Sequence, residues 1–266
     1  MTLLEPVPPV RPVAPWIGGK RILSKHLVSR INAVDHQTYA EVCVGMGGVF
    51  LRRTMRPKCE VINDISEDVS TFFRVVQHHY LPFVDMIRWQ ISSRANFEKL
   101  AAQDPSTLTD MQRAARFLYL QRLAFGGKVA GPRTFGVAPG LGGRFDVSKL
   151  VPMLEDLHER MTGVIIERLD WRKFIERWDR PGTLFYVDPP YYGCEKDYGP
   201  GLFSRDDFAQ MASVLAALKG RFILSINDHP DVRQIFARFT MEEVRCRYTI
   251  GGTASAKDFG ELIISN

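Results

Sequence analysis

The chain of 266 residues predicts an α/β fold, with a mainly parallel, doubly wound sheet and a mostly helical insert. Short apolar runs alternate with helical patterns up to about residue 80 and again after residue 161. Between them, residues 81–161 show a mainly helical pattern with scattered arginines and two glycine-rich stretches. The expected units are therefore a proline-rich arm (1–14), a core domain (15–80 and 162–266) and the insert (81–161).

The first part of the core predicts a helix, a strand, a short helix, a second strand and a longer helix. Five prolines between positions 6 and 15 make the preceding arm extended. The glycine-bearing segment 16–20 is followed by a helical pattern, which places five apolar residues on one face: Ile22, Leu23, Leu27, Val28 and Ile31. Residues 39–44 are predicted as strand, 49–51 as a short helix, 60–62 as strand and 67–79 as helix.

The alternation resumes after the insert. Residues 163–169 are predicted as a strand ending at Asp170, and residues 184–187 as the next strand. The segment Ser204 to Asp207 has a capping-box pattern that opens a helix to about residue 219, where Gly220 can stop it. Residues 222–226 form another strand, and 243–250 with 261–265 are expected to pair as a terminal hairpin around a glycine-containing loop.

Composition limits the class of protein. Hydrophobic residues make up 45% and charged residues 24%, as in an ordinary globular protein with a core. The net charge of +5 weakly favours a polyanionic partner. No apolar run is long enough for a membrane span, and the N-terminus lacks a signal pattern, so we expect a cytoplasmic monomer or weak dimer. Four cysteines without metal-binding spacing predict reduced thiols and no metal site: Cys43, Cys59, Cys194 and Cys246.

The most informative motif is Asp188-Pro189-Pro190-Tyr191, which begins where the apolar run 184–187 stops. Neither proline has a backbone N–H for sheet pairing, so the strand ends there. Ligands bind at the carboxyl ends of parallel strands in open α/β sheets. The motif suits a flat heterocycle with an exocyclic amine, because Asp188 and a proline carbonyl can accept from the amine while Tyr191 stacks on the ring. A structural proline turn is the simpler alternative.

A glycine turn, Gly45-Met46-Gly47-Gly48, lies between a predicted strand and a helix. Glycines there allow close backbone approach to a ligand, and a helix start favours an anionic group. Asp64 ends the next predicted strand, where an acid commonly binds ribose hydroxyls. Together they indicate an adenosine-containing cofactor, although a structural turn explains the glycines equally well. The pattern is not GxGxxG, which counts against a nicotinamide cofactor.

Three other sets of residues are candidates with simple structural alternatives. Trp16 and Lys20 precede the first strand, where a core Trp and a solvated Lys would be ordinary, and Asp170 at a strand end could merely cap a helix. Basic residues in or beside the glycine-broken loops of the insert are candidate phosphate contacts, although any one of them could simply face solvent: Arg122, Lys128, Arg133 and Arg144.

In order and spacing, the segments 16–20, 41–50, 63–65 and 188–191 resemble those of the D12-class, Dam-like adenine-N6 DNA methyltransferases. The similarity runs from about residue 15 to residue 264, without much of the middle. It implies a seven-stranded methyltransferase sheet, a target-recognition insert and S-adenosyl-L-methionine as the cofactor. By match to the family's motifs, the cofactor contacts would be Trp16, Lys20, Glu41, Gly45, Gly47, Asp64, Ile65, Asp170 and Asp188.

The resemblance predicts methylation of the N6 amine of an adenine flipped out of duplex DNA, as in restriction-modification. Tyr191 would stack on the base through its ring alone, so Tyr191→Phe is expected to be nearly harmless, and the loop 192–203 would close as a lid. The chain departs from the family pattern at Val42-Cys43, where Pro-Phe is usual. The insert lacks the Arg-Tyr-Asn stretch of GATC-reading members, which predicts another target.

Three alternatives remain open from the sequence. The same amine-accepting site would suit an enzyme that methylates RNA or a protein amide, although asparagine in place of the first Asp is more usual there. A nicotinamide-dependent oxidoreductase would use the glycine turn and Asp64 but would leave Asp188 and Tyr191 without a role. A catalytically inactive DNA-binding module would need only the basic insert.

Overall fold

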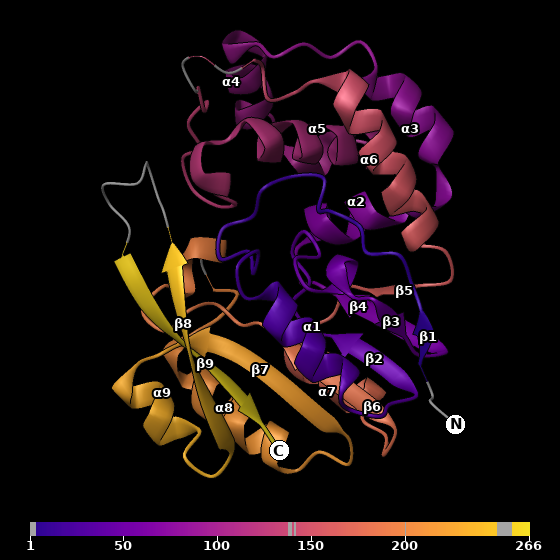
Figure 1. Cartoon of the computed structure of the whole chain (residues 1–266). Helices are drawn as coiled ribbons and strands as arrows, with labels where there is room; N and C mark the ends of the chain where they lie inside the picture. Colours follow the sequence, from indigo (N-terminus) through magenta and orange to yellow (C-terminus); the bar gives the residue numbers. More distant parts are fainter. Residues whose placement is uncertain (1–3, 138–139, 141, 200, 249–256) are drawn as a thin grey trace.

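The computed structural model describes residues 4–137, 140, 142–199, 201–248 and 257–266, and its core is a seven-stranded sheet (Figure 1). The strand order is β5-β4-β2-β6-β7-β9-β8. Neighbouring strands from β5 to β7 are parallel, and β9 is antiparallel to β7 and β8. This confirms the predicted sheet and terminal hairpin, whose connecting loop 249–256 lies outside the described residues. The strands are β2 (Thr38–Glu41), β4 (Cys59–Asn63), β5 (Ile165–Glu167), β6 (Thr183–Val187), β7 (Arg221–Asn227), β8 (Thr240–Tyr248) and β9 (Lys257–Ser265).

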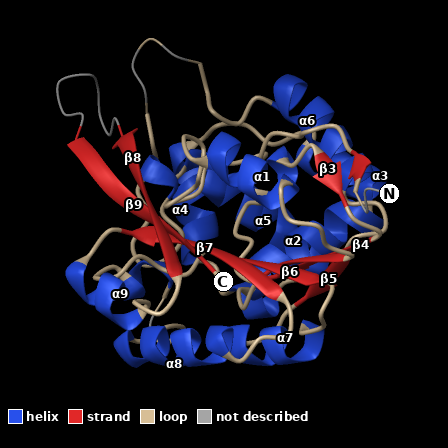
Figure 2. Cartoon of the chain, turned by 60° about the horizontal axis from the view of Figure 1, so that its bottom comes forward, coloured by secondary structure: helices blue, strands red, loops and turns tan. Residues whose placement is uncertain are grey.

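Helices cover both faces of the sheet (Figure 2). Alternate residues of β6 point to opposite faces, so Leu184 and Tyr186 join one hydrophobic core while Phe185 and Val187 join the other. Because both faces are buried, β6 is a continuous apolar run. The helices on the first face are α1 (Ser24–Asn32) and α2 (Glu67–His78), and those on the second are α7 (Trp171–Trp178), α8 (Arg205–Ala216) and α9 (Pro230–Ile235).

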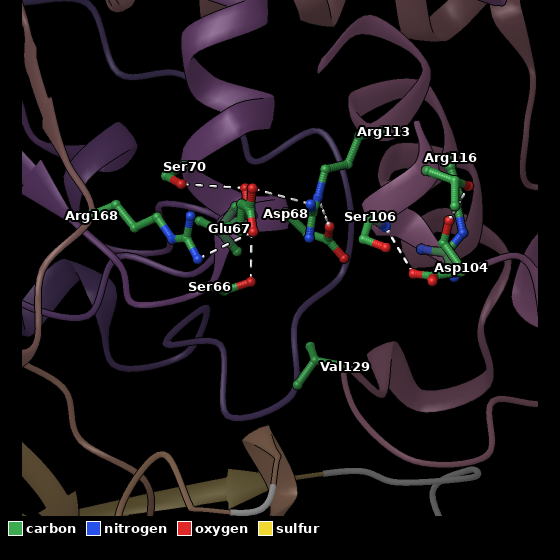
Figure 3. A network of polar contacts seen from close by, with 12 residues as sticks. Ser66, Glu67, Asp68, Ser70, Asp104, Ser106, Arg113, Arg116, Val129 and Arg168 are labelled. Carbon is green, nitrogen blue, oxygen red and sulfur yellow. Dashed lines mark hydrogen bonds and ion pairs between the residues drawn. The ribbon is translucent and has the colours of Figure 1, made fainter. Parts of the chain in front are cut away.

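The insert packs on α2, above the first face of the sheet (Figure 1). Its main helices are α3 (Tyr80–Ile87), α4 (Arg94–Ala102), α5 (Asp110–Leu123) and α6 (Val147–Arg160). Buried side chains of α5 belong to the same hydrophobic core as those of α2. Ion pairs reinforce this packing (Figure 3). Arg113 of α5 places its Nε 2.5 Å from Asp68 Oδ1 and its Nη1 3.2 Å from Glu67 Oε1, both at the start of α2. The insert is therefore firmly attached to the core.

The proline-rich arm is extended and packs along the core. Its strand β1 (Glu5–Pro6) pairs with β3 (Met55–Arg56). Further along, Val7 N donates to Thr54 O at 2.9 Å and Val10 N to Leu51 O at 2.7 Å. Buried apolar residues hold the arm in place: Leu4, Val7, Val10, Val13 and Ala14.

The predicted elements are present, but several boundaries differ. The strand predicted over 163–169 is only β5, helix α8 ends at Ala216 instead of about residue 219, and β8 and β9 both begin earlier than predicted. Helix α1 begins at Ser24, and Ile22 lies in the preceding turn with 49% of its surface exposed, so its expected place on the buried face is wrong. Lys20, which directly precedes this turn, is buried, with only 1% of its surface exposed. Strand β2 stops at Glu41, earlier than expected. The predicted capping box is confirmed, because Asp207 Oδ2 accepts from the main-chain N and the hydroxyl of Ser204, both at 2.7 Å.

Candidate active site

A cavity of about 690 Å³ lies at the carboxyl ends of the parallel strands. Four acidic residues at or just after the strand ends line it, and we call them the acid floor: Glu41 (β2), Asp64 (after β4), Asp170 (after β5) and Asp188 (after β6). The strand ends bring these acids together because parallel strands all finish at the same edge of the sheet. An acid floor suits a ligand with positive charge, amines or hydroxyl groups.

The glycine turn of the cavity is built around Trp16. Gly45 has a φ of 51°, and a Cβ at this position would lie 2.4 Å from the indole Nε1, so another residue would displace the ring. Asp64 holds the turn, because its Oδ2 accepts from Gly45 N and its Oδ1 from Ser66 N, both at 2.9 Å. Burial raises the pKa of Asp64, and these two hydrogen bonds oppose that shift.

Lys20 connects the N-terminal motif to the Asp-Pro-Pro-Tyr motif. Its Nζ lies 3.0 Å from Asp188 Oδ1, 3.6 Å from Glu261 Oε2 and 2.9 Å from the Tyr191 hydroxyl. That hydroxyl donates to Glu261 Oε1, and the Lys20 Nζ lies 4.3 Å from the centroid of the Tyr191 ring. We call these four residues the lysine-centred network. In this network the Tyr191 hydroxyl has two polar partners, Lys20 and Glu261. The sequence predicted a role for the Tyr191 ring only.

The network holds one oxygen of Asp188 and leaves acceptors for a ligand. The Ser225 hydroxyl, which pairs with the Tyr186 hydroxyl at 2.7 Å, donates to Asp188 Oδ1 at 3.3 Å. Lys20 binds the same oxygen. Within the described part of the chain, no hydrogen bond reaches Asp188 Oδ2 or the Pro189 carbonyl oxygen. Since Asp188 lines the cavity, its carboxylate can accept from an amine bound there.

Two acids of the floor ionise differently. Burial raises the pKa of Asp188 to about 6, with Lys20 opposing the shift and the charge of Glu261 adding to it. Burial raises the pKa of Glu41 to about 8, a hydrogen bond of 2.6 Å from the Tyr39 hydroxyl lowers it, and the charge of Asp188 raises it further. At pH 7, Asp188 is therefore mostly an acceptor-only carboxylate, whereas Glu41 is mostly protonated.

The structure brings most of the expected site residues to the cavity. Asp170 also caps α7, because its Oδ1 accepts from Arg172 N at 3.0 Å, so its cofactor and capping interpretations are compatible. Of the expected cofactor-binding and catalytic residues, all of which the structure describes, Gly47, Pro189 and Tyr191 do not line the cavity. The expected residues that line it are Trp16, Lys20, Glu41, Gly45, Asp64, Ile65, Asp170, Asp188 and Pro190.

The four basic candidates of the insert differ from one another. Arg122, Arg133 and Arg144 line the cavity, while Lys128 is exposed outside it. The Arg122 guanidinium donates to the main-chain oxygens of Arg144, at 2.9 and 3.1 Å, and of Val13, and Arg133 donates to that of Val129. These contacts stabilise the loops of the insert. No hydrogen bond or ion pair joins the Lys128 or Arg144 side chain to another described residue.

The first glycine-rich stretch of the insert contacts the segment 15–17 beside the cavity. Gln121 Nε2 donates to the main-chain oxygens of Pro15 and Gly127, both at 2.8 Å, and Ile17 N donates to Gly127 O at 3.2 Å. A Cβ at Gly127 would lie 3.1 Å from Trp16 N. These contacts therefore hold in place the segment that carries Trp16 and Lys20.

Sequence reasoning missed two contributors to the site. Glu261 of β9 is 1% exposed, and its sequence pattern predicts only a terminal strand. A charged residue directly before the apolar run 262–264 was the available signal. Tyr198 lies in the expected lid loop, and its hydroxyl donates to Ile17 O at 3.1 Å. With Leu202 and Phe203 it lines the cavity, so the described part of the loop 192–203, which lacks residue 200, covers the site.

The seven-stranded sheet with an Asp-Pro-Pro-Tyr motif at a strand end is the arrangement that the sequence predicted for an amino-methyltransferase. The family model of the D12 class N6 adenine-specific DNA methyltransferases matches residues 16–250, and the chain belongs to this family. It is thus an adenine-specific DNA methyltransferase, as the motifs predicted.

Relatives extend over nearly the whole chain. The chain is 24% identical to the type II methyltransferase M1.LlaDCHI of Lactococcus lactis subsp. cremoris, over 97% of this chain and 95% of the relative. It is 19% identical to the type II methyltransferase M.CviBI of Paramecium bursaria Chlorella virus NC1A, over 90% and 91%. It is 24% identical to the retron Ec67 DNA adenine methylase of Escherichia coli, over 93% and 88%.

Two further findings concern the described residues only. None of their helices is both long and apolar enough to cross a membrane. Their His, Cys, Asp and Glu side chains form no group of three or more that could hold a metal ion.

Proposed function

We propose that the protein transfers a methyl group from S-adenosyl-L-methionine to the N6 amine of an adenine flipped out of duplex DNA. The observation that carries this proposal is the Asp188 carboxylate, held through Oδ1 while Oδ2 and the Pro189 carbonyl remain as acceptors. The lone pair of N6 is delocalised into the purine ring, which makes the amine a poor nucleophile. Hydrogen bonds from N6 to both acceptors would favour the pyramidal nitrogen that attacks a methyl group.

The cavity residues fit S-adenosyl-L-methionine, which supplies an electrophilic methyl group on a cationic sulfur when bound. Asp64 would bind the ribose hydroxyls and Asp170 would lie near the adenine of the cofactor, because both residues line the cavity. Gly45, in the cavity lining, and Gly47, two residues further along the same turn, would lie beside the methionine part. Trp16 and Lys20 complete the cofactor side, with Glu41 and Ile65 at its border.

The chain's own residues orient the acceptor and the base. Lys20 and Ser225 fix Asp188 Oδ1, which leaves Oδ2 for N6. A pKa of about 6 keeps Asp188 ionised at pH 7 and still makes it a reasonable acceptor for the proton that N6 loses. The Tyr191 ring would stack on the flipped adenine, held by the contacts of its hydroxyl with Lys20 and Glu261.

Duplex DNA would be read by the insert, with Arg122, Lys128, Arg133 and Arg144 as candidate contacts. Type II methyltransferases among the relatives support a restriction-modification role. We propose that the protein acts in the cytoplasm as a monomer or weak dimer, without a metal ion. A target other than GATC remains part of this proposal.

The test is methyl transfer from S-adenosyl-L-methionine labelled on its methyl group to unmethylated duplex DNA, followed by digestion to nucleosides. The proposal predicts label in N6-methyladenine only. Parallel reactions with RNA and with protein test the alternative substrates. Label in another base, or transfer to RNA or protein but not to DNA, would contradict the proposal.

A further inference from the structure

Three arginines of the arm and the core domain form a cluster that the proposed function does not use. Arg21 directly follows Lys20, and Arg52 ends the short helix η1 (Phe50–Arg52); both line the cavity. Arg11 lies in the proline-rich arm and is exposed. The hydrogen bond from Val10 N to Leu51 O sets Arg11 and Arg52 on adjoining chain segments. We call Arg11, Arg21 and Arg52 the arm arginine cluster.

The positive charges of this cluster are close together and uncompensated. Burial lowers the pKa of Arg52, and the positive charges of Arg21 and then Arg11 lower it further, so each of these two residues repels Arg52. Within the described part of the chain, none of the three forms an ion pair with an acid. Grouping like charges costs stability, and an anionic partner would remove that cost.

The cluster differs from the arginines of the insert. The guanidinium groups of Arg122 and Arg133 are engaged by main-chain oxygens of the insert and the arm. In the cluster, only Arg52 has such a contact, at 2.6 Å from Gly48 O, and neither the Arg11 nor the Arg21 side chain donates to another described residue. Arg11 and Arg21 therefore keep all their donors for a partner.

On the basis of the proposed function, we propose that the arm arginine cluster binds phosphates of the DNA strand that carries the flipped adenine. Arg21 and Arg52 lie in the cavity wall, and Arg11 continues the positive charge outward along the arm. A flipped nucleotide stays connected to its neighbours through phosphates, so negative charges must pass the rim of the cavity. Three positive charges reaching beyond the cavity suit a strand of phosphates better than the single carboxylate of the cofactor.

The test is the salt dependence of duplex DNA binding by the double variant Arg11→Gln/Arg21→Gln. Arg52 is left in place because it supports the glycine turn. The matched control is Arg221→Gln/Arg238→Gln, which removes the same charge from two exposed arginines, of which Arg221 starts β7 at the opposite end of that strand from the cavity.

Each phosphate contact contributes about 0.9 to the slope of log affinity against log salt concentration, or roughly eightfold in affinity at 0.1 M salt. We expect the cluster variant to lose about 2 in slope, with unchanged affinity for S-adenosylhomocysteine and unchanged target sequence. The control variant should lose much less.

Equal slopes in the cluster variant and the control would overturn this inference while leaving the methyltransferase function intact. Weakened S-adenosylhomocysteine binding with an unchanged slope would assign the cluster to the cofactor and also overturn it. A wild-type protein that neither binds nor methylates duplex DNA would overturn the proposed function together with this inference.

Discussion

The acid floor of the cavity and the basic loops of the insert use their charged side chains in opposite ways. On the floor, Asp64 and Asp188 are held by main-chain N–H groups, Lys20 and Ser225, and Asp188 keeps acceptors for a ligand. In the insert, Arg122 and Arg133 donate to main-chain oxygens and so build the loops themselves. The charged groups of the floor are therefore oriented toward a ligand, whereas Arg122 at the end of α5 and Arg133 stabilise the conformation of the insert.

The largest expected effect is on the floor. Replacing Asp188 with Ala removes the acceptor for N6, and we expect turnover to fall by at least about 10²–10³ while DNA binding persists. Turnover is measured with saturating cofactor and DNA. Asp156→Ala, at an exposed position of α6, is the control and should behave as wild type. An Asp188→Ala variant with more than a tenth of wild-type turnover would contradict the assignment.

Asp64→Ala should act on the cofactor rather than on DNA. Loss of charge-assisted hydrogen bonds to the ribose is expected to weaken S-adenosylhomocysteine binding by about 1.5–3 kcal/mol, measured by calorimetry. The variant also loses the acceptor that holds Gly45. Asp64→Asn retains one acceptor oxygen, so we expect a smaller loss. An unchanged dissociation constant for Asp64→Ala would mean that this carboxylate only holds the turn.

The floor could be predicted from the sequence because its residues follow strands. Hydrophobic runs locate strand ends, where ligands bind in open sheets, and this predicts Asp64 and Asp188 as ligand-binding residues. A cofactor role for Asp170 follows only from the resemblance to the family. The contacts of Glu261 could not be predicted in this way. This residue meets Tyr191 and Lys20 only because an antiparallel strand adds to the sheet, and such register depends on packing rather than on local pattern. The close approach of Gly127 to Trp16 could not be predicted either, because these two residues are far apart in the sequence.

Tyr191 tests whether the lysine-centred network belongs to the site. Tyr191→Ala should cost about 1–3 kcal/mol of base stacking. Because its hydroxyl bonds Glu261 and Lys20, we now expect Tyr191→Phe to have a smaller but measurable effect, of about 0.5–1.5 kcal/mol. With 2-aminopurine at the target position, wild type should give the strongest fluorescence increase, the Phe variant less and the Ala variant least. Equal signals from Tyr191→Phe and wild type would restrict Tyr191 to its ring.

The smallest effects are expected in the insert. Arg144→Gln and Lys128→Gln should either lower the salt slope of DNA binding by about 1, as phosphate contacts do, or relax the recognised sequence at one position. Arg122→Gln should instead lower the thermal unfolding temperature, because it removes hydrogen bonds within the protein. Single-molecule sequencing of methylated DNA gives the target. Methylation confined to GATC would contradict the predicted departure from that site.

The ionisation of Asp188 gives the most direct test of the account. Activity requires its carboxylate form, so kcat/KM should fall about tenfold per pH unit below the pKa of about 6 and level off above it. The charge of Lys20 lowers this pKa and that of Glu261 raises it. Relative to wild type, the acid limb of the pH profile should therefore move to higher pH in Lys20→Met and to lower pH in Glu261→Gln. Acid limbs that stay in place, or that move in the same direction in both variants, would contradict the claim that this network prepares Asp188 for the N6 amine.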